Sequence, residues 1–296
     1  MKKKRVIIDT DPAMGVPFRD IDDGLAILFL MASPEISLEA ITINFGNVGA
    51  GRGARVANEL LDICQKSIPV FTGAESKQQL GVENKAVEYM VDTVNKNPGE
   101  ITLLAVAPLT NVATAMMLDD TFAENLGELV IMGGSMNFGI FSYFGEFNFH
   151  LDGMAASLVM NAPVPKTLIT MDVISNAVFR ESHLDMLKGH GGAVHRYMVD
   201  SIGPWLRLNR KVFFKKKGFF PWDPVAAAYL VDRSLFDENY FRFNLRHRGI
   251  RSGSMSEITR CNSNICDHGS CPVNIPLTLD PEGFMDLFIK RLNSYD

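Results

Sequence analysis

Short, continuous apolar runs that each end in polar or glycine residues constrain the fold of this chain more than any other feature. The clearest is Ile101–Ala107 (ITLLAVA), and Val6–Ile8, Leu38–Ile43, Leu129–Met132 and Thr167–Met171 are similar. Runs of this length without polar alternation are typical of strands that are buried on both faces. Such strands need helices on both sides, so the runs predict a parallel sheet inside an α/β protein.

Helical patterns fill the intervals between these runs, which indicates consecutive βαβ units. No linker, repeat or low-complexity stretch interrupts the order, and the one charge run, Lys215–Lys217, is typical of a solvated loop or helix end. We therefore expect one domain over residues 1–296, with an open, mainly parallel central sheet and helices on both faces. The predicted helices are Asp22–Ala32, a segment ending near Cys64, Leu109–Met117 and Asp152–Met160.

Charge and hydropathy exclude several classes of protein. The chain has 29 Lys+Arg and 34 Asp+Glu, a net charge of −5, whereas dedicated nucleic-acid binders carry a basic surplus. The basic start at Lys2–Arg5 is followed by only three apolar residues before Asp9, too few for a signal peptide. No stretch approaches the roughly 18 apolar residues of a membrane span. We expect a cytoplasmic protein with neither nucleic-acid nor membrane partners.

The densest chemistry lies between the first strand and the first helix. Asp9, Asp11, Asp20, Asp22 and Asp23 place five carboxylates within fifteen residues. Such a group repels itself unless a cation or many N–H donors compensate. A helix cap would explain one of these residues but not the set. Carboxylate oxygens are ligands for Ca²⁺ or Mg²⁺ and not for zinc, so the sequence predicts a hard-cation site here.

Polar side chains follow other predicted strands as well. Asn44 and Asn47 come after the second strand, and Asp172 after the last one. Open α/β sheets bind ligands beyond the carboxyl ends of their strands. Any one of these residues is explained as a cap, but together they favour a ligand site at one edge of the sheet.

The acidic segment also carries a family resemblance. Asp9–Pro12 (DTDP), followed by Asp22-Asp23 at the start of a hydrophobic helix, resembles the inosine–uridine preferring nucleoside hydrolase family. The similarity covers about residues 5–292, and its specificity comes from several segments in the right order. The further segments are Thr42–Val48 (TINFGNV), Val106–Asn111 (VAPLTN), Val130–Gly134 (VIMGG), Glu146–Asn148 (EFN) followed by Asp152, and Trp222–Pro224 (WDP).

The resemblance implies a Ca²⁺-dependent enzyme that hydrolyses a ribonucleoside to free base and ribose. Its partner would be a small-molecule nucleoside, and we expect a homodimer or homotetramer. Asp11 would also be the general base that activates water. The implied calcium ligands are Asp11, both oxygens of Asp23, the carbonyl of Val106, and Asp223.

The remaining implied roles concern the sugar. Asp22 is similar to the residue that holds a ribose hydroxyl, and Asn47 to the one near the attacking water. Glu146 and Asn148 match the pair that grips the 5′-hydroxyl, and Asn137 the asparagine just upstream. Glycosidic cleavage builds positive charge on the ribose, which surrounding carboxylates stabilise.

The leaving base needs activation too. Many family members place a His directly before the late Asp, but this chain has Trp222 there. Trp222 resembles the purine-preferring branch, in which an aromatic ring stacks on the base, so purine nucleosides are the expected substrates. The alternative is core packing beside Phe219 and Phe220. His195 and Arg207 lie upstream and could deliver a proton, although a lone His is more often structural.

Two departures from the family pattern stand out. Nine residues, Ala13 to Ile21, separate Pro12 from the Asp pair where the family has two, and Asp20 is an extra carboxylate of unknown role. Near the end of the chain, a C-x4-C-x-H-x2-C pattern matches none of the common structural zinc sites. We expect a surface loop with reduced thiols there. Its residues are Cys261, Cys266, His268 and Cys271.

Three other functions compete with nucleoside hydrolysis. A haloacid-dehalogenase-type phosphatase also has Asp-x-Asp after its first strand, but it needs Gly-Thr where Pro12 stands. Gly49–Ala54 formally fits G-x-G-x-x-A, a weak signal for dinucleotide binding when alone. The long insertion leaves open a nucleoside- or ribose-binding protein with little turnover.

Overall fold

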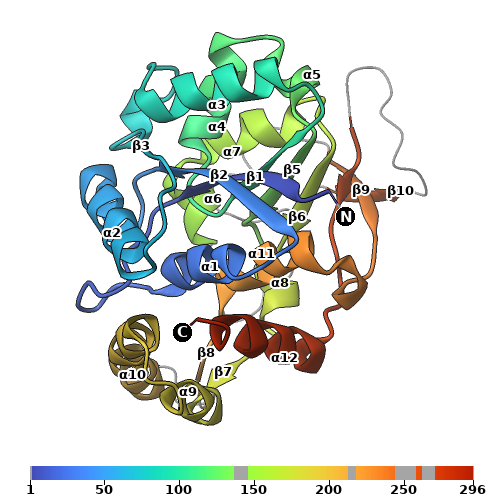
Figure 1. Ribbon diagram of the computed structural model, residues 1–296. Coiled ribbons are helices and arrows are strands. Elements are labelled where there is room, and N and C mark those ends of the chain that lie inside the picture. The colour runs from blue at the N-terminus through green and yellow to red at the C-terminus, as the bar shows by residue number, and fades with distance from the viewer. Residues whose placement is uncertain (1, 137–145, 213–217, 244–257, 262–270, 296) are drawn as a thin grey trace.

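The structure, a computed structural model, describes residues 2–136, 146–212, 218–243, 258–261 and 271–295. A nine-stranded sheet runs through its centre (Figure 1). The strands of this sheet are β1 (Lys4–Thr10), β2 (Ile36–Ile43), β3 (Val70–Thr72), β4 (Ile101–Ala105), β5 (Glu128–Met132), β6 (Lys166–Ile169), β9 (Tyr240–Phe243), β10 (Ile258–Cys261) and β11 (Val273–Asn274).

The spatial order of the strands is β10-β9-β11-β6-β5-β4-β1-β2-β3. Neighbouring strands from β11 to β3 are parallel, and β9 is antiparallel to both β10 and β11. β1 therefore lies between β4 and β2, well inside the parallel part. A separate antiparallel pair joins β7 (Phe179–Arg180) to β8 (Gly218–Phe219).

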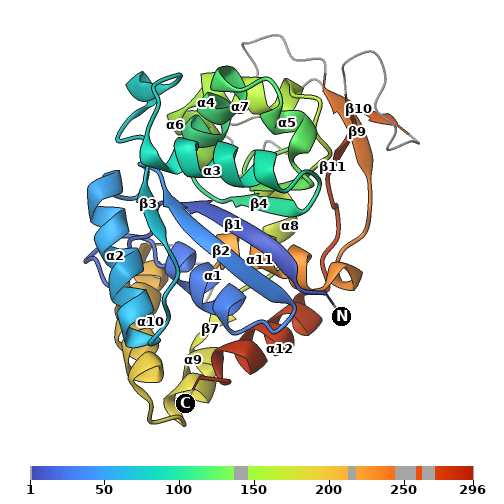
Figure 2. The same ribbon diagram turned by 45° about the horizontal axis from the view of Figure 1, so that its top comes forward.

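Helices cover both faces of the sheet (Figure 2). They are α1 (Asp22–Met31), α2 (Ala50–Ile63), α3 (Lys85–Lys96), α4 (Thr110–Leu118), α5 (Phe122–Asn125), α6 (Phe147–Leu151), α7 (Gly153–Asn161), α8 (Met171–Ile174), α9 (Glu181–Lys188), α10 (Ala193–Val212), α11 (Trp222–Val231) and α12 (Pro281–Leu292).

Alternation along β1 divides the core into two layers. Val6 and Ile8 pack with α1, α2, α11 and α12, whereas Ile7 packs on the other face with α3, α4, α5 and α7. All three side chains are completely buried. The sequence-based expectation of an α/β fold with a mainly parallel sheet and helices on both faces is confirmed.

One predicted strand is shorter than expected. β6 ends at Ile169, and Met171 already belongs to α8, so the run Thr167–Met171 is not a single strand. Met171, the last apolar residue of the run, is half-buried and is the first residue of α8. Asp172 consequently lies in α8, where its Oδ2 accepts the N–H of Met136 at 2.7 Å. Lys215–Lys217 fall outside the described residues.

None of the helices in the described segments combines the length and apolar character that a membrane-spanning helix needs.

A buried lysine closes one end of α7. Lys166 is 4% exposed, and its Nζ donates to the carbonyl oxygens of Ala162 at 2.6 Å and Met160 at 3.3 Å. Unpaired carbonyls at a helix C-terminus attract cations. Burial nevertheless lowers the pKa of Lys166 to about 8, because the charged ammonium loses its hydration.

This shift predicts an unusual pH dependence. The unfolded chain binds a proton at Lys166 up to its ordinary pKa of 10.5, whereas the folded chain releases it near pH 8. Lys166 should therefore add stability as the pH rises between these values, by up to about 3 kcal/mol. Denaturant unfolding of wild type and Lys166→Met at pH 7.5 and 10 measures this. If the free energies of unfolding of the two proteins differed by the same amount at both pH values, the prediction would be contradicted.

Candidate functional site

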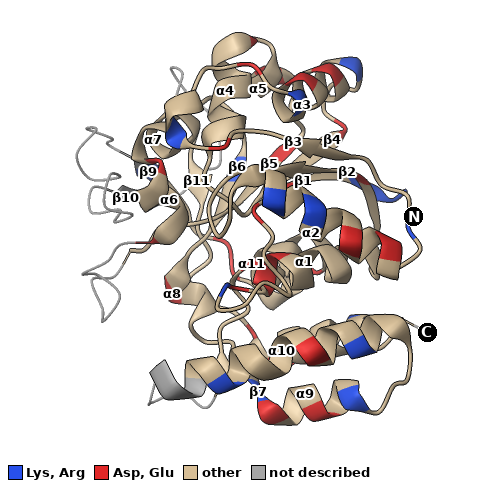
Figure 3. Ribbon diagram, turned by 90° about the vertical axis from the view of Figure 1, so that its left-hand side faces the viewer, with Lys and Arg blue, Asp and Glu red and all other residues tan. Residues whose placement is uncertain are grey.

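Five carboxylates meet where β1 ends and two helices begin. Asp11 follows β1, Asp22 and Asp23 form the first turn of α1, and Asp223 lies in the first turn of α11. These four are at most 3% exposed, and Asp20 is half-buried beside them. In Figure 3, red acidic segments come together where α1 and α11 meet. We call these five residues the acidic cluster.

Oxygens of three members approach one another most closely. One carboxylate oxygen each from Asp22, Asp23 and Asp223 lies within 4.8 Å of the other two. The backbone N–H of Asp223 donates to Oδ2 of Asp22 at 3.4 Å, although 201 positions separate them. Two helix N-termini thus face the same small volume, and both favour negative charge there.

Asp11 and Asp23 form the second half of the cluster. Asp23 Oδ1 accepts the hydroxyl of Thr10 and the N–H of Asp11, the latter at 3.0 Å, and its Oδ2 accepts Asn47 Nδ2 at 3.0 Å. The N–H of Asn47 donates to Oδ2 of Asp11. Asp11 and Asp23 are therefore in contact despite the insertion that separates them in the sequence. Asn47, from the loop after β2, is brought into contact with both.

Burial and mutual repulsion disfavour the charged forms of these groups. Burial raises the pKa of Asp223 well above its usual value, and Asp22, Asp23, Asp11 and Asp20 all raise it further. For Asp11, burial and then the charge of Asp23 raise the pKa in the same way. A divalent cation would relieve both effects. The donors are all hard oxygens, the set that Ca²⁺ or Mg²⁺ prefers, so the residues fit such an ion.

Asp9 belongs to a different group of contacts. Its carboxylate accepts Thr42 Oγ1 at 2.8 Å, Asn111 Nδ2 at 2.9 Å and Asn44 Nδ2 at 3.4 Å. Complete burial still raises the pKa of Asp9 to about 7. Asp9 thus joins β1 to β2 and α4 and holds the base of the site. The sequence-based expectation that Asp9 belongs to the cation site is therefore wrong. Asn111 had no expected role, although it belongs to the VAPLTN segment that resembles the family.

The described residues expected around the 5′-hydroxyl lie at the start of α6 and contact the segments that follow β4 and β5. Glu146 caps α6: its Oε1 accepts the N–H of Asn148 at 2.7 Å, and its Oε2 accepts those of Phe149 at 2.8 Å and Gly134 at 3.0 Å. Asn148 Nδ2 donates to the carbonyl of Val106 at 2.9 Å. The structure therefore brings Glu146, Asn148 and Val106 together. Asn137 lies outside the described residues.

Trp222 begins α11 directly before Asp223. It is half-buried, and its ring lies 4.8 Å from that of Phe220 at a tilt of 42°. The ring packs against the core, as the packing interpretation expects, and the residue directly precedes Asp223 of the acidic cluster in the chain.

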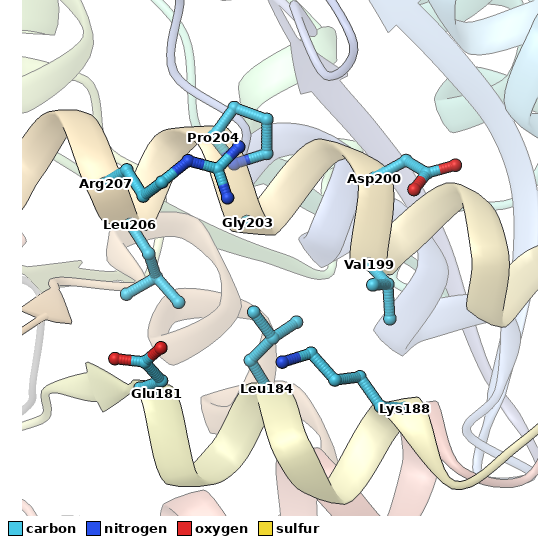
Figure 4. A pocket seen from close by; sticks show the side chains of 9 residues that line it. All are labelled: Glu181, Leu184, Lys188, Val199, Asp200, Gly203, Pro204, Leu206 and Arg207. Atoms are coloured by element: carbon cyan, nitrogen blue, oxygen red, sulfur yellow. The ribbon is translucent and has the colours of Figure 1, made fainter.

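His195 and Arg207 are both on α10. His195 is fully buried and stacks on His190 at 4.6 Å, and burial lowers its pKa. This environment fits the structural interpretation. Arg207 lines a 420 Å³ cleft between α9 and α10 with Glu181 and Lys188 (Figure 4). Of the acidic cluster, no member lines that cleft.

The glycine pattern at Gly49–Ala54 forms the N-terminus of α2. The carboxylate of Glu75 already accepts the N–H groups of Ala50 and Gly51 there, each at 2.8 Å. In dinucleotide-binding proteins a pyrophosphate takes these donors. A carboxylate in this place repels phosphate, so the segment is not a dinucleotide site.

The insertion Ala13–Ile21 starts with buried residues. Ala13 and Met14 are at most 1% exposed, and the hydroxyl of Tyr197 on α10 donates to the carbonyl of Met14 at 3.0 Å. Gly24 in α1 leaves room for Met14, since a Cβ there would lie 2.6 Å from the Cβ of Met14.

The cysteine prediction is partly wrong. Cys261 is half-buried at the end of β10, and Cys271 is buried and disulfide-bonded, so Cys271 is not a reduced thiol. A disulfide depends on the spatial approach of two cysteines, which spacing alone does not show. Cys266 and His268 lie outside the described residues.

Comparison with known proteins identifies the family. Residues 6–286 match the inosine-uridine preferring nucleoside hydrolase family. The chain belongs to this family. As a nucleoside hydrolase it cleaves the N-glycosidic bond of ribonucleosides, which excludes the phosphatase alternative.

Relatives and solved structures agree with this assignment. The pyrimidine-specific ribonucleoside hydrolase RihB of Escherichia coli O1:K1 / APEC is 30% identical over 100% of this chain and 99% of its own. The probable uridine nucleosidase 2 of Arabidopsis thaliana is 28% identical over 85% and 84%. The plant nucleoside hydrolase PpNRh1 superposes with a TM-score of 0.84 at 26% identity, covering 98% of this chain and 99% of that one. The purine-preferring ribonucleoside hydrolase from Gardnerella vaginalis, at 21% identity and a TM-score of 0.83 over 99% of both chains, shares the fold.

The crowded carboxylates predict a stabilising mutation. The folded-state pKa of Asp223 lies above its unfolded value of 3.8, so this residue removes stability as the pH rises above about 4. With chelator present at pH 8, Asp223→Asn should therefore melt at a higher temperature than wild type, with a free energy of unfolding larger by about 1–3 kcal/mol. This gain should vanish near pH 4. Calorimetry measures it. The matched control Asp185→Asn, on exposed α9, should change stability by less than about 0.5 kcal/mol. A destabilised Asp223→Asn in chelator would contradict the account.

Proposed function

We propose that this nucleoside hydrolase depends on Ca²⁺, favours purine nucleosides and works in the cytoplasm as a homodimer or homotetramer, with residues 1–296 forming one domain. The observation that carries the calcium proposal is the acidic cluster. Its buried oxygens come from the end of β1 and from two helix N-termini, and no basic side chain is among their hydrogen-bond partners in the described residues. A hard cation is the simplest neutralising partner for such a set.

We propose that Asp11, Asp23, Asp223 and the carbonyl of Val106 hold the ion. Bound calcium would offset their repulsion, make a water more acidic and polarise ribose hydroxyls, since it accepts 6–8 oxygens. Asn148 already donates to the Val106 carbonyl, which leaves one lone pair of that oxygen for a cation.

The chain's own residues then perform the hydrolysis. Asp11 takes a proton from water, the water oxygen bonds to the anomeric carbon, and the bond to the base breaks with its electron pair going to the base nitrogen. Positive charge that builds on the ribose is stabilised by the carboxylates. General-base help is worth roughly 10²–10⁴-fold. Asn47, which contacts Asp11 and Asp23, is placed to orient the water.

Other residues of the proposed site bind the sugar. Asp22 accepts a ribose hydroxyl. Glu146 and Asn148, with Asn137 upstream, take the 5′-hydroxyl. Among the described residues, Oε1 of Glu146 accepts a single N–H, which leaves a lone pair for a hydroxyl donor.

Trp222 supports the purine preference, because its half-buried indole, directly before Asp223 in the chain, offers a stacking surface for the larger base. Pyrimidine nucleosides are the second candidate. Similarity to the pyrimidine-specific ribonucleoside hydrolase RihB and to the probable uridine nucleosidase 2 favours them. Release of free base from a panel of purine and pyrimidine nucleosides discriminates between the two.

The calcium and base-catalysis proposals predict the result of metal removal. A chelator should abolish base release by the wild type, and added Ca²⁺ should restore it and raise the melting temperature, since a ligand held only by the folded state stabilises it. Asp11→Asn should lower turnover at least about 100-fold at saturating Ca²⁺ while keeping the fold by circular dichroism. Full activity of the wild type in chelator would refute the proposed role of calcium. Full activity of Asp11→Asn would refute its role as general base.

If Trp222 stacks on the base, its removal should lower kcat/KM by an amount that depends on the substrate. Trp222→Ala should lower kcat/KM for inosine by about 5- to 150-fold, the range expected for one base–aromatic stack. It should affect p-nitrophenyl riboside far less, because that leaving group needs no activation. Trp222→Phe keeps an aromatic ring and serves as the control. Equal losses on both substrates would instead indicate core packing.

A further inference from the structure

The insertion Ala13–Ile21 begins and ends at the acidic cluster. Asp11 precedes it, and Asp20, near its end, lies beside Asp22, with its Oδ1 accepting the N–H of Ile21 at 2.7 Å. Its first residues are fixed, with Met14 packed over Gly24 and bonded through its carbonyl to Tyr197. The N–H of Val16 closes a turn onto the carbonyl of Ala13 at 2.9 Å. In Figure 1 this loop precedes α1 and lies between α2 and α10.

The tip of the insertion presents an aromatic ring to solvent. Phe18 is 84% exposed, more than any other large apolar side chain in the described segments. Its φ of +62° is a backbone conformation that bulky residues rarely adopt. An exposed ring on a strained backbone does not stabilise the fold, and strain of this kind concentrates at ligand-binding segments.

The tether to Asp20 limits how far Phe18 lies from the acidic cluster. Two residues of chain span at most about 7 Å between Cα atoms. The Cα of Phe18 therefore lies within about 7 Å of the Cα of Asp20, which adjoins the carboxylates proposed to hold the ribose. With the sugar at those carboxylates, the part of the substrate that extends outward is the flat aromatic base. Aromatic side chains bind bases through their π-faces with little dependence on sequence.

We propose that the insertion is a base-binding element whose Phe18 contacts the base of the bound nucleoside from the solvent side. This inference rests on the proposed function, because it takes the ribose to lie at the acidic cluster. The fixed root, Ala13 to Val16, holds the loop in place, and Asp20 ties its far end to the site. Phe18 thereby adds to affinity for any nucleoside and nothing to affinity for free ribose.

Binding of uncleavable nucleosides tests this inference separately from hydrolysis. Formycin B and pseudouridine carry their base on carbon, so calorimetric titration with Ca²⁺ present gives a Kd without turnover. Phe18→Ala should raise the Kd of formycin B and of pseudouridine by about 5- to 150-fold and leave the Kd of ribose unchanged. Phe18→Tyr should retain tight binding. Phe18→Gly should bind as weakly as Phe18→Ala but melt at a higher temperature, because glycine adopts positive φ without strain.

The control is Met186→Ala, which removes a 56% exposed apolar side chain from α9 and should change no Kd. Unchanged Kd values for Phe18→Ala would overturn the inference. If analytical ultracentrifugation also showed that this variant dissociates into smaller species while binding stays intact, Phe18 would be a subunit contact instead. If the wild type releases no base but Phe18→Ala still loses formycin B, hydrolysis is refuted and the inference stands.

Discussion

Repulsion among buried carboxylates is the constraint on which the rest of this structure depends. Two unit charges 4 Å apart repel by about 4 kcal/mol at an effective dielectric constant of 20. Whole domains are stable by only about 5–15 kcal/mol, so five such groups cannot all be ionised in a dry site without a compensating cation. The raised pKa values of Asp11 and Asp223 express the same cost. The site is thus built at the expense of the stability of the cation-free protein, which is common where binding sites are preorganised.

The fold meets this constraint through its topology. β1 lies inside the parallel sheet, so the chain just beyond its end is surrounded by neighbouring strand ends and by helices on both faces. Asp9 uses this position to bind β2 and α4, while Asp11, two residues later, faces Asp23 and Asn47. One carboxylate therefore secures the framework, and the next belongs to the site. Packing of α11 against α1 then supplies Asp223.

Much of this was predictable from local patterns. Continuous apolar runs indicated the buried strands, and the sheet class followed from their alternation with helices. The carboxylates between Asp9 and Asp23 indicated a hard-cation site, because their density within one loop is itself a local property. The expected partnership of Asp223 came only from family resemblance. The strand end at Met171 and the thiol state of Cys271 were misjudged, since each depends on contacts with distant parts of the chain.

The sequence by itself determined the fold class, the acidic segment and the order of motifs that marks the family, because each is carried by residues close together along the chain. Only the tertiary structure decided which groups meet. It paired Asp22 with the backbone N–H of Asp223. It placed the carboxylate of Glu75 at the N-terminus of α2, where the glycine pattern had suggested a phosphate. It also separated Asp9 from the acidic cluster that Asp9 adjoins in the sequence. It also left Phe18 exposed while burying Met14 of the same loop. Contacts between distant segments are set by packing of the whole chain, and no local pattern encodes them.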